Sequence, residues 1–390
     1  MAHKDVVNVG MIGCGFMGKT HSFGYRNVNP IWDPPVKAVM KCITGSRSRE
    51  TCQAAAQSYG WQDYEADWQD MLQRDDIDLV DIGTPNFLHH EQALAAVEAG
   101  KDILCEKPLA MTLAEARQMT QAAEEAGVKA MCGFTYRQAP AVRLARQIIE
   151  AGEVGEVYHW RAVYLQDWII DPEFPLVWRL DADTCGSGSL GDLAAHLIDM
   201  ALLLVGDIAE VSAVLETFVK ERPLVAAGGG TGLVDKRAAG QKGQVKVDDA
   251  ALCCCRFANG AVGTFEATRF AQGHKNGHRW EINGSKGSLA WSLEDMNYLE
   301  FYKAGEGNRQ GFRKILATEG DTPGWEAWWP AGHIIGYGEL FINEIYEMLC
   351  AIAEDRQPAP SFRDGLKCQA VLDAFTQSAR SKQWVPVPPC

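Results

Sequence analysis

A lysine at the end of a predicted buried strand is the residue of this sequence best placed to do chemistry. Glu106-Lys107-Pro108 follows directly on the apolar run Ile103-Leu104-Cys105. A buried amine is costly, yet open α/β sheets bind their ligands at the carboxyl ends of strands. Because Lys107 precedes a proline, its backbone is restricted to extended conformations, and X-Pro bonds are the ones that adopt the cis form. We therefore predict that Lys107 takes part in proton transfer.

A second set of ionisable residues shares one predicted helix. Asp192, His196 and Asp199 recur at spacings of four and three in an apolar segment that runs to Val205, so they lie on one helical face. Such groups need water, one another or a ligand as partners. Asp192 can hold the His196 ring in one tautomer and leave its other nitrogen for a substrate hydroxyl, whereas Asp199 is interpreted as structural.

A glycine-rich turn predicts a dinucleotide site. Gly13-x-Gly15-x-x-Gly18 follows the strand pattern of residues 6–12 and precedes a helix, which is the context this motif requires. Gly13 permits the tight turn, Gly15 lets the backbone approach a pyrophosphate, and Gly18 permits close packing of helix on strand. The helix N-terminus supplies amide donors and a partial positive charge. We expect Lys107 and His196 to meet over the nicotinamide ring.

The end of the second predicted strand bears on the choice of cofactor. It reads Ile43-Thr44-Gly45-Ser46-Arg47-Ser48-Arg49, without an acid before Glu50. A carboxylate there would bind the ribose 2′-hydroxyl of NAD, whereas hydroxyls and arginines suit a 2′-phosphate. This favours NADP, with NAD possible. The alternative is that the arginines only begin a solvated helix and that either cofactor is accepted.

Composition excludes several classes of protein. The net charge of −14 argues against a nucleic-acid partner. The chain has no uninterrupted apolar run of roughly 18 residues and no signal-peptide pattern at its start, so we expect a cytoplasmic protein without a membrane span. The twelve cysteines include no CxxC pair, and the adjacent His89-His90 do not have zinc spacing. We expect free thiols and no metal.

The order of predicted elements indicates two domains. In the first third of the chain, predicted strands alternate with predicted helices. Examples of these helices are residues 49–60, residues 91–100 and one that starts at the Thr112/Glu115 capping box. This alternation predicts an α/β Rossmann domain with a doubly wound parallel sheet. The predicted strands of this part are Val6–Ile12, Val36–Ile43, Leu79–Ile82, Ile103–Cys105 and Lys129–Phe134.

Later strands are long and antiparallel in pattern. Asn259-Gly260 and Asn283-Gly284-Ser285-Lys286 are turns of two predicted hairpins, which indicates an α+β domain with a large open, mainly antiparallel sheet. We place the domains at 1–135 and 136–390, with a C-terminal helix near 364–381 that can pack back on the first domain. Residues 222–244 are interpreted as a long surface loop.

The chain resembles the glucose–fructose oxidoreductase/inositol dehydrogenase/MocA (Gfo/Idh/MocA) family over nearly its whole length. The matching pieces are the glycine fingerprint, Thr84-Pro85-Asn86-Phe87-Leu88-His89, Glu106-Lys107-Pro108, Phe134-Thr135-Tyr136-Arg137, and Gly191-Asp192 with His196 and Asp199. The resemblance implies Lys107, Asp192 and His196 as the catalytic group and a homodimer or homotetramer formed through the open sheet. With the residues that it adds, the predicted cofactor contacts are Gly13, Gly15, Phe16, Met17, Gly18, Ser46, Arg47, Thr84, Pro85, Asn86, His89, Glu106 and Lys107.

Three further segments are similar to the levoglucosan dehydrogenase and scyllo-inositol/L-glucose dehydrogenase branch. They are Tyr164-Leu165-Gln166-Asp167-Trp168, Pro175-Leu176-x-Trp178-Arg179 and Gly336-Tyr337-Gly338-Glu339. That branch oxidises a ring hydroxyl of a sugar or cyclitol and typically uses NAD, a pattern from which Ser46 and Arg47 depart. A ring polyol needs many polar partners and a flat apolar surface. The predicted substrate contacts are Lys107, Tyr136, Gln166, Trp168, Arg179, Asp192 and His196.

These residues predict an NAD(P)-dependent oxidoreductase that moves a hydride between nicotinamide and a ring secondary hydroxyl or ketone of a sugar, anhydrosugar or inositol. Two alternatives remain. One is an NAD-dependent glycosidase of the same fold, which oxidises and re-reduces its sugar. The other is a non-enzymatic sugar or nucleotide sensor, which would be expected to lack Lys107 or His196.

Overall fold

The chain folds into two compact units. The computed structural model describes residues 5–45, 48–225 and 238–390. Unit 1 comprises Met1–Gln138 and Ile335–Leu366, and unit 2 comprises Ala139–Ile334 and Lys367–Cys390. The first segment of unit 1 ends at Gln138, close to the domain boundary that we predicted at residue 135. Residues 335–366, however, group with unit 1 and not with the second domain, because helix α9 packs against helix α1.

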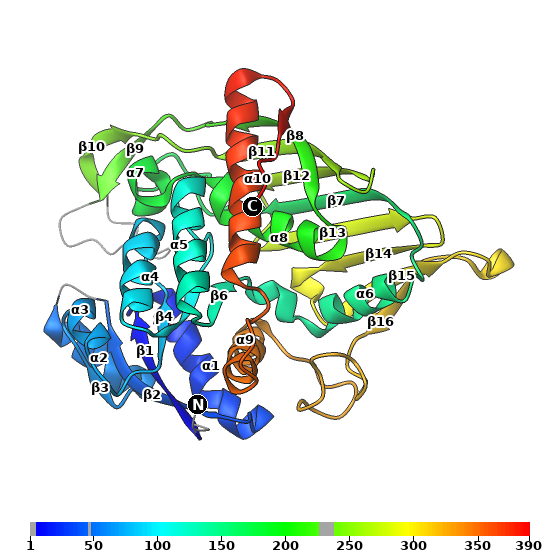
Figure 1. The fold of residues 1–390 in the computed structure, drawn as a ribbon. Helices are drawn as coiled ribbons and strands as arrows, with labels where there is room; N and C mark the ends of the chain where they lie inside the picture. The colour runs from blue at the N-terminus through cyan, green and yellow to red at the C-terminus, as the bar shows by residue number, and fades with distance from the viewer. Residues whose placement is uncertain (1–4, 46–47, 226–237) are drawn as a thin grey trace. The chain divides into compact units, whose positions relative to one another are not determined.

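Unit 1 is built on a parallel sheet of six strands in the order β3-β2-β1-β4-β5-β6. Figure 1 labels all of them except β5. This confirms the predicted doubly wound parallel sheet. The strand order reverses between β1 and β4, which is where open α/β sheets bind ligands. The strands are β1 Val6–Ile12, β2 Lys37–Thr44, β3 Asp63–Tyr64, β4 Leu79–Ile82, β5 Asp102–Glu106 and β6 Ala130–Gly133.

Local signals set the helices of unit 1. The predicted capping box is present at the start of α5, where Thr112 accepts from the Glu115 amide and Glu115 reaches back, and the helix ends at Gly127 in the left-handed conformation. Helix α9 is tied to α1 by the stacked rings of Trp32 and Tyr346, whose centroids are 4.2 Å apart. The helices are α1 Phe16–Trp32, α2 Arg49–Tyr59, α3 Trp68–Leu72, α4 His89–Glu98, α5 Leu113–Ala126 and α9 Tyr337–Ala353.

Unit 2 is built on a sheet of nine strands in the order β16-β15-β14-β13-β7-β12-β11-β8-β17. All neighbours are antiparallel except β7 and β12, so the expected open, mainly antiparallel sheet is confirmed. The strands are β7 Val157–Leu165, β8 Ile208–Glu216, β11 Ala250–Phe257, β12 Val262–Thr268, β13 Gly277–Gly284, β14 Gly287–Ser292, β15 Tyr298–Lys303, β16 Arg313–Leu316 and β17 Val385–Pro386.

Both predicted hairpins are present. Strands β11 and β12 pair across Asn259-Gly260, where Gly260 has a φ of +93°, and β13 pairs with β14. Strand β11 alternates buried and exposed residues because one face of the sheet is covered and the other is open. Helices α6 Pro140–Glu150, α8 Ala195–Leu204 and α10 Phe362–Ser381 lie on the covered face, and α7 Ala182–Cys185 is short (Figure 1).

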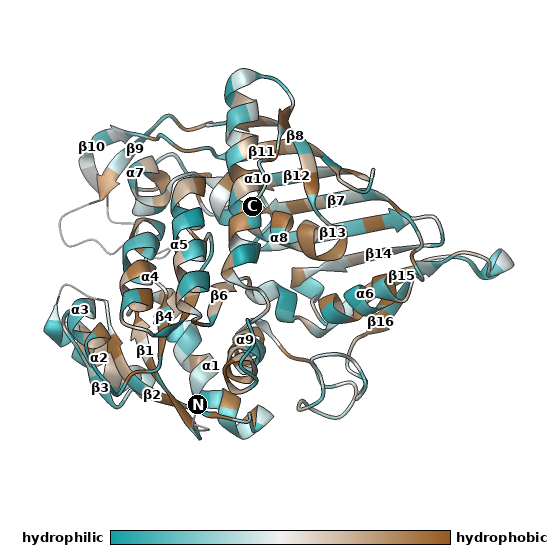
Figure 2. Cartoon of the chain, viewed as in Figure 1, coloured by the Kyte–Doolittle hydropathy of each residue, from teal (hydrophilic) through white to brown (hydrophobic). Residues whose placement is uncertain are grey.

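The core of unit 2 lies between the sheet and its helices. Stacked Trp160 and Trp280 rings, 5.9 Å apart, and the Phe265–Phe375 contact fill this layer. The stretch Ala182–Leu204 is long and apolar enough to cross a membrane, with a mean hydropathy of 1.2, but 78% of that window is buried inside the protein. The hydrophobic colouring of α8 in Figure 2 is therefore that of a core helix.

The prediction of a loop over 222–244 is wrong at both ends. Strands β9 Glu221–Val225 and β10 Ala238–Gln244 pair with each other, and Arg222 is fully buried. The Arg222 guanidinium donates to the carbonyl oxygens of Ile169, Asp171 and Phe174, so a long-range contact fixes a segment whose local composition resembles a loop. Residues 226–237 lie outside the described part.

Candidate active site

The glycine fingerprint forms a cradle between β1 and α1. Gly13 has a φ of +142°, and a Cβ there would come within 2.8 Å of the Gly83 carbonyl oxygen. A Cβ at Gly18 would lie 1.8 Å from the Gly13 oxygen, whereas one at Gly15 would meet no described atom within 4 Å. No side chain of the described residues caps the first turn of α1, which Phe16 and Met17 begin. The open space at Gly15 and the amides of α1 fit a dinucleotide pyrophosphate.

The end of β2 packs against this cradle. A Cβ at Gly45 would come within 2.5 Å of the Gly13 nitrogen. Glu50, the first acid after β2, accepts a 2.6 Å hydrogen bond from Ser48, and the Arg49 guanidinium lies 5.2 Å from the centre of the Tyr64 ring. The predicted contacts Ser46 and Arg47 lie outside the described residues.

The loops after β4 and β5 are joined by a buried histidine. Thr84, Pro85 and Asn86 follow β4, and the Thr84 hydroxyl donates to Gln92 over 2.7 Å. Both ring nitrogens of the fully buried His89 lie 3.0 Å from a backbone oxygen, one of Thr84 and one of Pro108. His89, which we predicted as a cofactor contact, thus ties together the two loops that carry other predicted contacts.

Glu106 and Lys107 lie where β5 ends. The peptide bond between Lys107 and Pro108 is cis. The Lys107 amide donates to Glu106 Oε2 over 3.1 Å, and Glu106 is buried. Because β1, β4 and β5 are neighbours, their carboxyl ends bring the fingerprint, the 84–86 loop and Lys107 to one side of the sheet, called here the carboxyl edge.

Beneath the carboxyl edge lies a polar network that sequence reasoning missed. His21 Nδ1 is 2.7 Å from Asp81 Oδ2 and His21 Nε2 is 3.1 Å from Glu106 Oε1, and the Tyr25 hydroxyl donates to the same Asp81 oxygen over 2.8 Å. Burial alone would lower the pKa of His21, but the two carboxylates outweigh it and raise that pKa well above its ordinary value. The available signals were a histidine three residues after Gly18 and an aspartate inside apolar β4.

Unit 2 holds the second predicted group. Asp192 lies in a π-helical turn, Leu190–Ala194, directly before α8, and such turns recur at functional sites. Asp192 Oδ2 accepts from Arg269 Nη2 over 2.8 Å, and Arg269 is almost fully buried. The His196 ring, also buried, lies 5.9 Å from the Tyr164 ring and 6.4 Å from the His278 ring.

Two of the predicted sugar contacts of unit 2, Gln166 and Trp168, belong to one hydrogen-bonded set. Trp168 Nε1 donates to Gln166, and Gln166 and Tyr164 both donate to the Asn276 side-chain oxygen, over 2.9, 2.9 and 2.7 Å. The Arg269 guanidinium lies 5.5 Å from the Trp168 ring centre. Sequence reasoning did not find Arg269 or Asn276, which reach this set from other parts of the sheet.

Arg179 and Tyr136 complete the predicted contacts. The Arg179 guanidinium lies 4.3 Å from the Trp178 ring centre, and its carbonyl oxygen accepts from Arg269. Tyr136 is buried in unit 1, where its ring lies 6.5 Å from that of Tyr337. Lys107 is therefore a residue of unit 1, and Asp192 and His196 are residues of unit 2.

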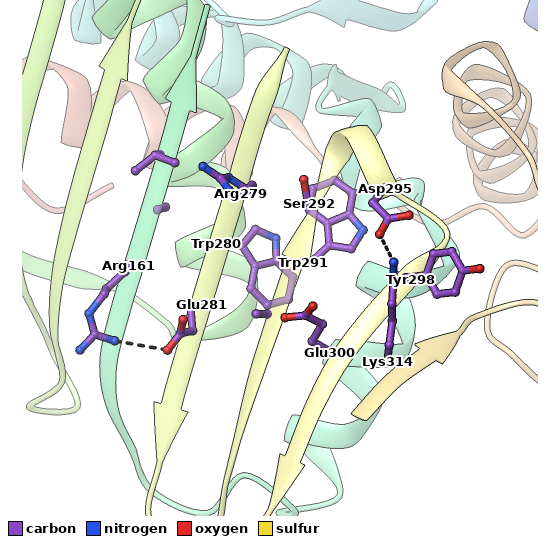
Figure 3. Close-up of a pocket in the computed structure, with 13 residues that line it drawn as sticks. Arg161, Arg279, Trp280, Glu281, Trp291, Ser292, Asp295, Tyr298, Glu300 and Lys314 are labelled. Atoms are coloured by element: carbon purple, nitrogen blue, oxygen red, sulfur yellow. Dashed lines mark ion pairs between the residues drawn. The ribbon is translucent and has the colours of Figure 1, made fainter. Parts of the chain in front are cut away.

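A hollow on the open face of the nine-stranded sheet is separate from these predicted residues. Its volume is about 480 Å³, and it is lined by charged pairs such as Arg161 with Glu281 and Lys314 with Asp295 (Figure 3). Glu300 reaches into the same area. Among the described residues, no group of three or more histidine, cysteine, aspartate or glutamate side chains is arranged to hold a metal ion.

Comparison with protein-family models matches both halves of the chain. Residues 7–134 match the oxidoreductase family with an NAD-binding Rossmann fold, and residues 142–290 match the GFO/IDH/MocA C-terminal domain. The chain belongs to the Gfo/Idh/MocA family. The predicted recognition is thereby confirmed, and so is the binding of a nicotinamide dinucleotide at the level of the family.

Individual relatives of this Gfo/Idh/MocA protein extend over its whole length. It is 43% identical to a levoglucosan dehydrogenase of Pseudarthrobacter phenanthrenivorans over 98% of both chains. A levoglucosan dehydrogenase structure in complex with NADH and levoglucosan matches with a TM-score of 0.92 and 42% identity over 98% of this chain and 99% of that one. An oxidoreductase domain protein from Kribbella flavida matches with a TM-score of 0.93 and 49% identity over 98% and 100%.

Proposed function

We propose that this protein is a dehydrogenase that transfers a hydride between a nicotinamide cofactor and a ring secondary hydroxyl or ketone of a sugar, anhydrosugar or inositol. The observation that carries the proposal is the pairing of two constellations in one chain. One is a dinucleotide cradle with Lys107 at the same carboxyl edge, and the other is His196 and Asp192 beside a set of polar and aromatic side chains. The full-length similarity to levoglucosan dehydrogenase supports an anhydrosugar as the first substrate to test.

Each residue has a defined task in the proposed reaction. The bound cofactor would accept or supply the hydride. His196 exchanges the proton of the reacting hydroxyl, and Lys107 shares that proton and stabilises negative charge on the oxygen. Asp192, fixed by Arg269, orients the pair. Gln166, Trp168, Arg179 and Tyr136 bind the remaining hydroxyls and one face of the ring.

A spectrophotometric screen at 340 nm tests this function. Levoglucosan, inositols and hexoses are each incubated with NAD and with NADP, and we expect a clear rate with at least one polyol. An absence of net absorbance change, combined with release of free sugar from a glycoside, would favour the NAD-dependent glycosidase. Binding without any turnover would favour the sensor, an alternative that the presence of Lys107 and His196 argues against.

The preference for NADP over NAD remains a proposal from Ser46 and Arg47. The NADH complexes of levoglucosan dehydrogenase speak for NAD in that relative. We expect Arg47→Asp to weaken NADP use on the order of 10- to 100-fold while NAD use is retained or improved, because a carboxylate repels a 2′-phosphate and binds a 2′-hydroxyl. The ratio of kcat/KM for the two cofactors measures this, with Arg146→Asp, at an exposed surface pair of unit 2, as the control. An unchanged ratio in Arg47→Asp would remove Arg47 from the cofactor site.

The open face of the nine-stranded sheet is proposed as the contact of a homodimer or homotetramer. Val214 and Leu252 are cross-strand partners on that face and are 62% and 51% exposed. We also propose a cytoplasmic location without a metal, which agrees with the twelve free thiols, nine of them buried.

A further inference from the structure

The network beneath the carboxyl edge holds more charge than packing needs. His21 is fully buried in α1, Asp81 is fully buried in β4, and Glu106 is buried at the end of β5. Buried carboxylates are costly unless they are paired and hydrogen-bonded. Apolar side chains would fill the same space without this cost. We therefore infer that the three ionisable side chains have a role beyond packing.

The distances decide the protonation of the histidine. Each ring nitrogen of His21 faces a carboxylate oxygen, Asp81 Oδ2 at 2.7 Å and Glu106 Oε1 at 3.1 Å. A neutral imidazole carries only one N–H, so it would present a lone pair to one of these oxygens. Glu106 Oε2 accepts the Lys107 amide at the same time, so it is the other oxygen that faces the ring. A doubly protonated His21 gives each of the two carboxylates an N–H donor and a positive charge.

The described groups that act on the network besides the two carboxylates are an aromatic ring and further acidic or neutral side chains. The Phe341 ring of α9 lies 5.2 Å from the His21 ring. Glu344, one turn further along α9, is buried and acts on Tyr25. The titratable groups that face the network from α1, β4, β5 and α9 are Tyr25, Asp81, Cys105, Glu106 and Glu344.

We propose that His21 is a positioning residue of the dehydrogenase, a buried cation that clamps Asp81 to Glu106 and so holds Glu106 and the Lys107 backbone in place at the carboxyl edge. The inference rests on the proposed function for its catalytic consequence. Its structural part, the charge on His21, does not depend on the identity of the substrate.

The charge is tested on the whole protein without turnover. In ¹⁵N-histidine NMR spectra the His21 signal should show both ring nitrogens protonated throughout pH 6–8. The signal is assigned from its loss in His21→Gln or, if that variant does not fold, by replacing each of the other eight of the nine histidines in turn. A singly protonated His21 ring at pH 8 would overturn the inference.

The positioning role is tested by measuring kcat and KM separately. In His21→Gln the two carboxylates lose the cation between them, so Glu106 and the Lys107 backbone are held less firmly. We expect kcat to fall on the order of 10²-fold at every pH from 6 to 9, while the KM for the sugar stays within about threefold of the wild type. Tyr25→Phe is the matched control, because it removes a hydrogen bond to the same Asp81 oxygen but no charge. Its kcat should stay within about threefold of the wild type. A folded His21→Gln with the wild-type kcat would refute the role, whereas a failure of the substrate screen would leave the NMR result valid.

Discussion

At the scale of single residues, the assignment of Lys107 and His196 makes the most direct prediction. Lys107→Ala and His196→Ala should each lower kcat on the order of 10²- to 10⁴-fold at saturating substrate, because each removes a positioned acid–base group. The double variant should lose little more than the worse single one, since residues of one catalytic unit are not additive.

Matched variants control for this loss. Lys303 pairs with Glu153 at the surface, and His90 bonds to Gln118 away from the proposed chemistry, so Lys303→Ala and His90→Ala should keep wild-type kcat. Near-normal turnover in Lys107→Ala or His196→Ala would contradict the mechanism.

The buried His21 also predicts how stability depends on pH. Its pKa is raised in the folded protein, so its contribution is fully present below the unfolded value of about 6.5 and is lost as pH rises toward the folded pKa. Above that unfolded value, the free energy of unfolding of the wild type should fall relative to His21→Gln by about 1.4 kcal/mol per pH unit.

Urea unfolding at several pH values between 6 and 9 measures this slope. Tyr25→Phe should unfold more easily than the wild type at each pH but keep the wild-type slope, because it removes a hydrogen bond to the Asp81 carboxylate but no charge. A wild-type slope equal to that of His21→Gln would mean that His21 binds no extra proton in the folded state.

At the scale of elements, two fingerprint glycines separate folding from ligand binding. Gly18→Ala should destabilise unit 1 and abolish dinucleotide binding, because its Cβ would collide with the Gly13 oxygen at 1.8 Å. Gly15→Ala meets no described atom, so it should keep the wild-type Tm while dinucleotide affinity falls at least about tenfold by loss of close backbone approach.

Thermal melts measure the effect of each variant on stability, and fluorescence titration with NADH measures its effect on dinucleotide affinity. Gly100 is a useful control, since it too has open space around its Cβ position but lies at a helix end away from the fingerprint. Gly100→Ala, at a φ of +66°, should lower Tm slightly and leave NADH affinity unchanged. Wild-type NADH affinity in Gly15→Ala would contradict the pyrophosphate site.

The elements also show which features a sequence can predict. Strands β1 and β4, the capping box of α5 and the β11–β12 hairpin follow from signals within a few residues, and the structure confirms them. His21 and Asp81 are 60 residues apart, and Asp192 and Arg269 are 77 apart. Those pairs depend on strand order, which local periodicity does not encode, so their partners could not be predicted from the sequence.

Within each unit, the arrangement of strands decides where the proposed chemistry and the proposed subunit contact lie. The strand order of unit 1 gathers the described members of the predicted cofactor contacts near the ends of β1, β4 and β5. The sheet of unit 2 is covered by helices on one face only. Its other face carries the exposed apolar residues Val214 and Leu252 and the charged pairs drawn in Figure 3. Exposed apolar patches of this kind mark contacts between proteins.

At the scale of the whole molecule, the proposed oligomer depends on the open face. Leu252→Glu should convert the oligomer to a monomer, because in a symmetric contact the new carboxylate is buried without a partner. Light scattering coupled to size exclusion measures the mass. Val6→Glu, at a 42% exposed apolar residue of unit 1, is the control and should keep the oligomer. Because Leu252 is half exposed, Leu252→Glu should change the free energy of unfolding of unit 2 by no more than about 0.5 kcal/mol. If the wild type is a monomer, there is no such contact. If the oligomer survives Leu252→Glu, the contact between subunits lies elsewhere.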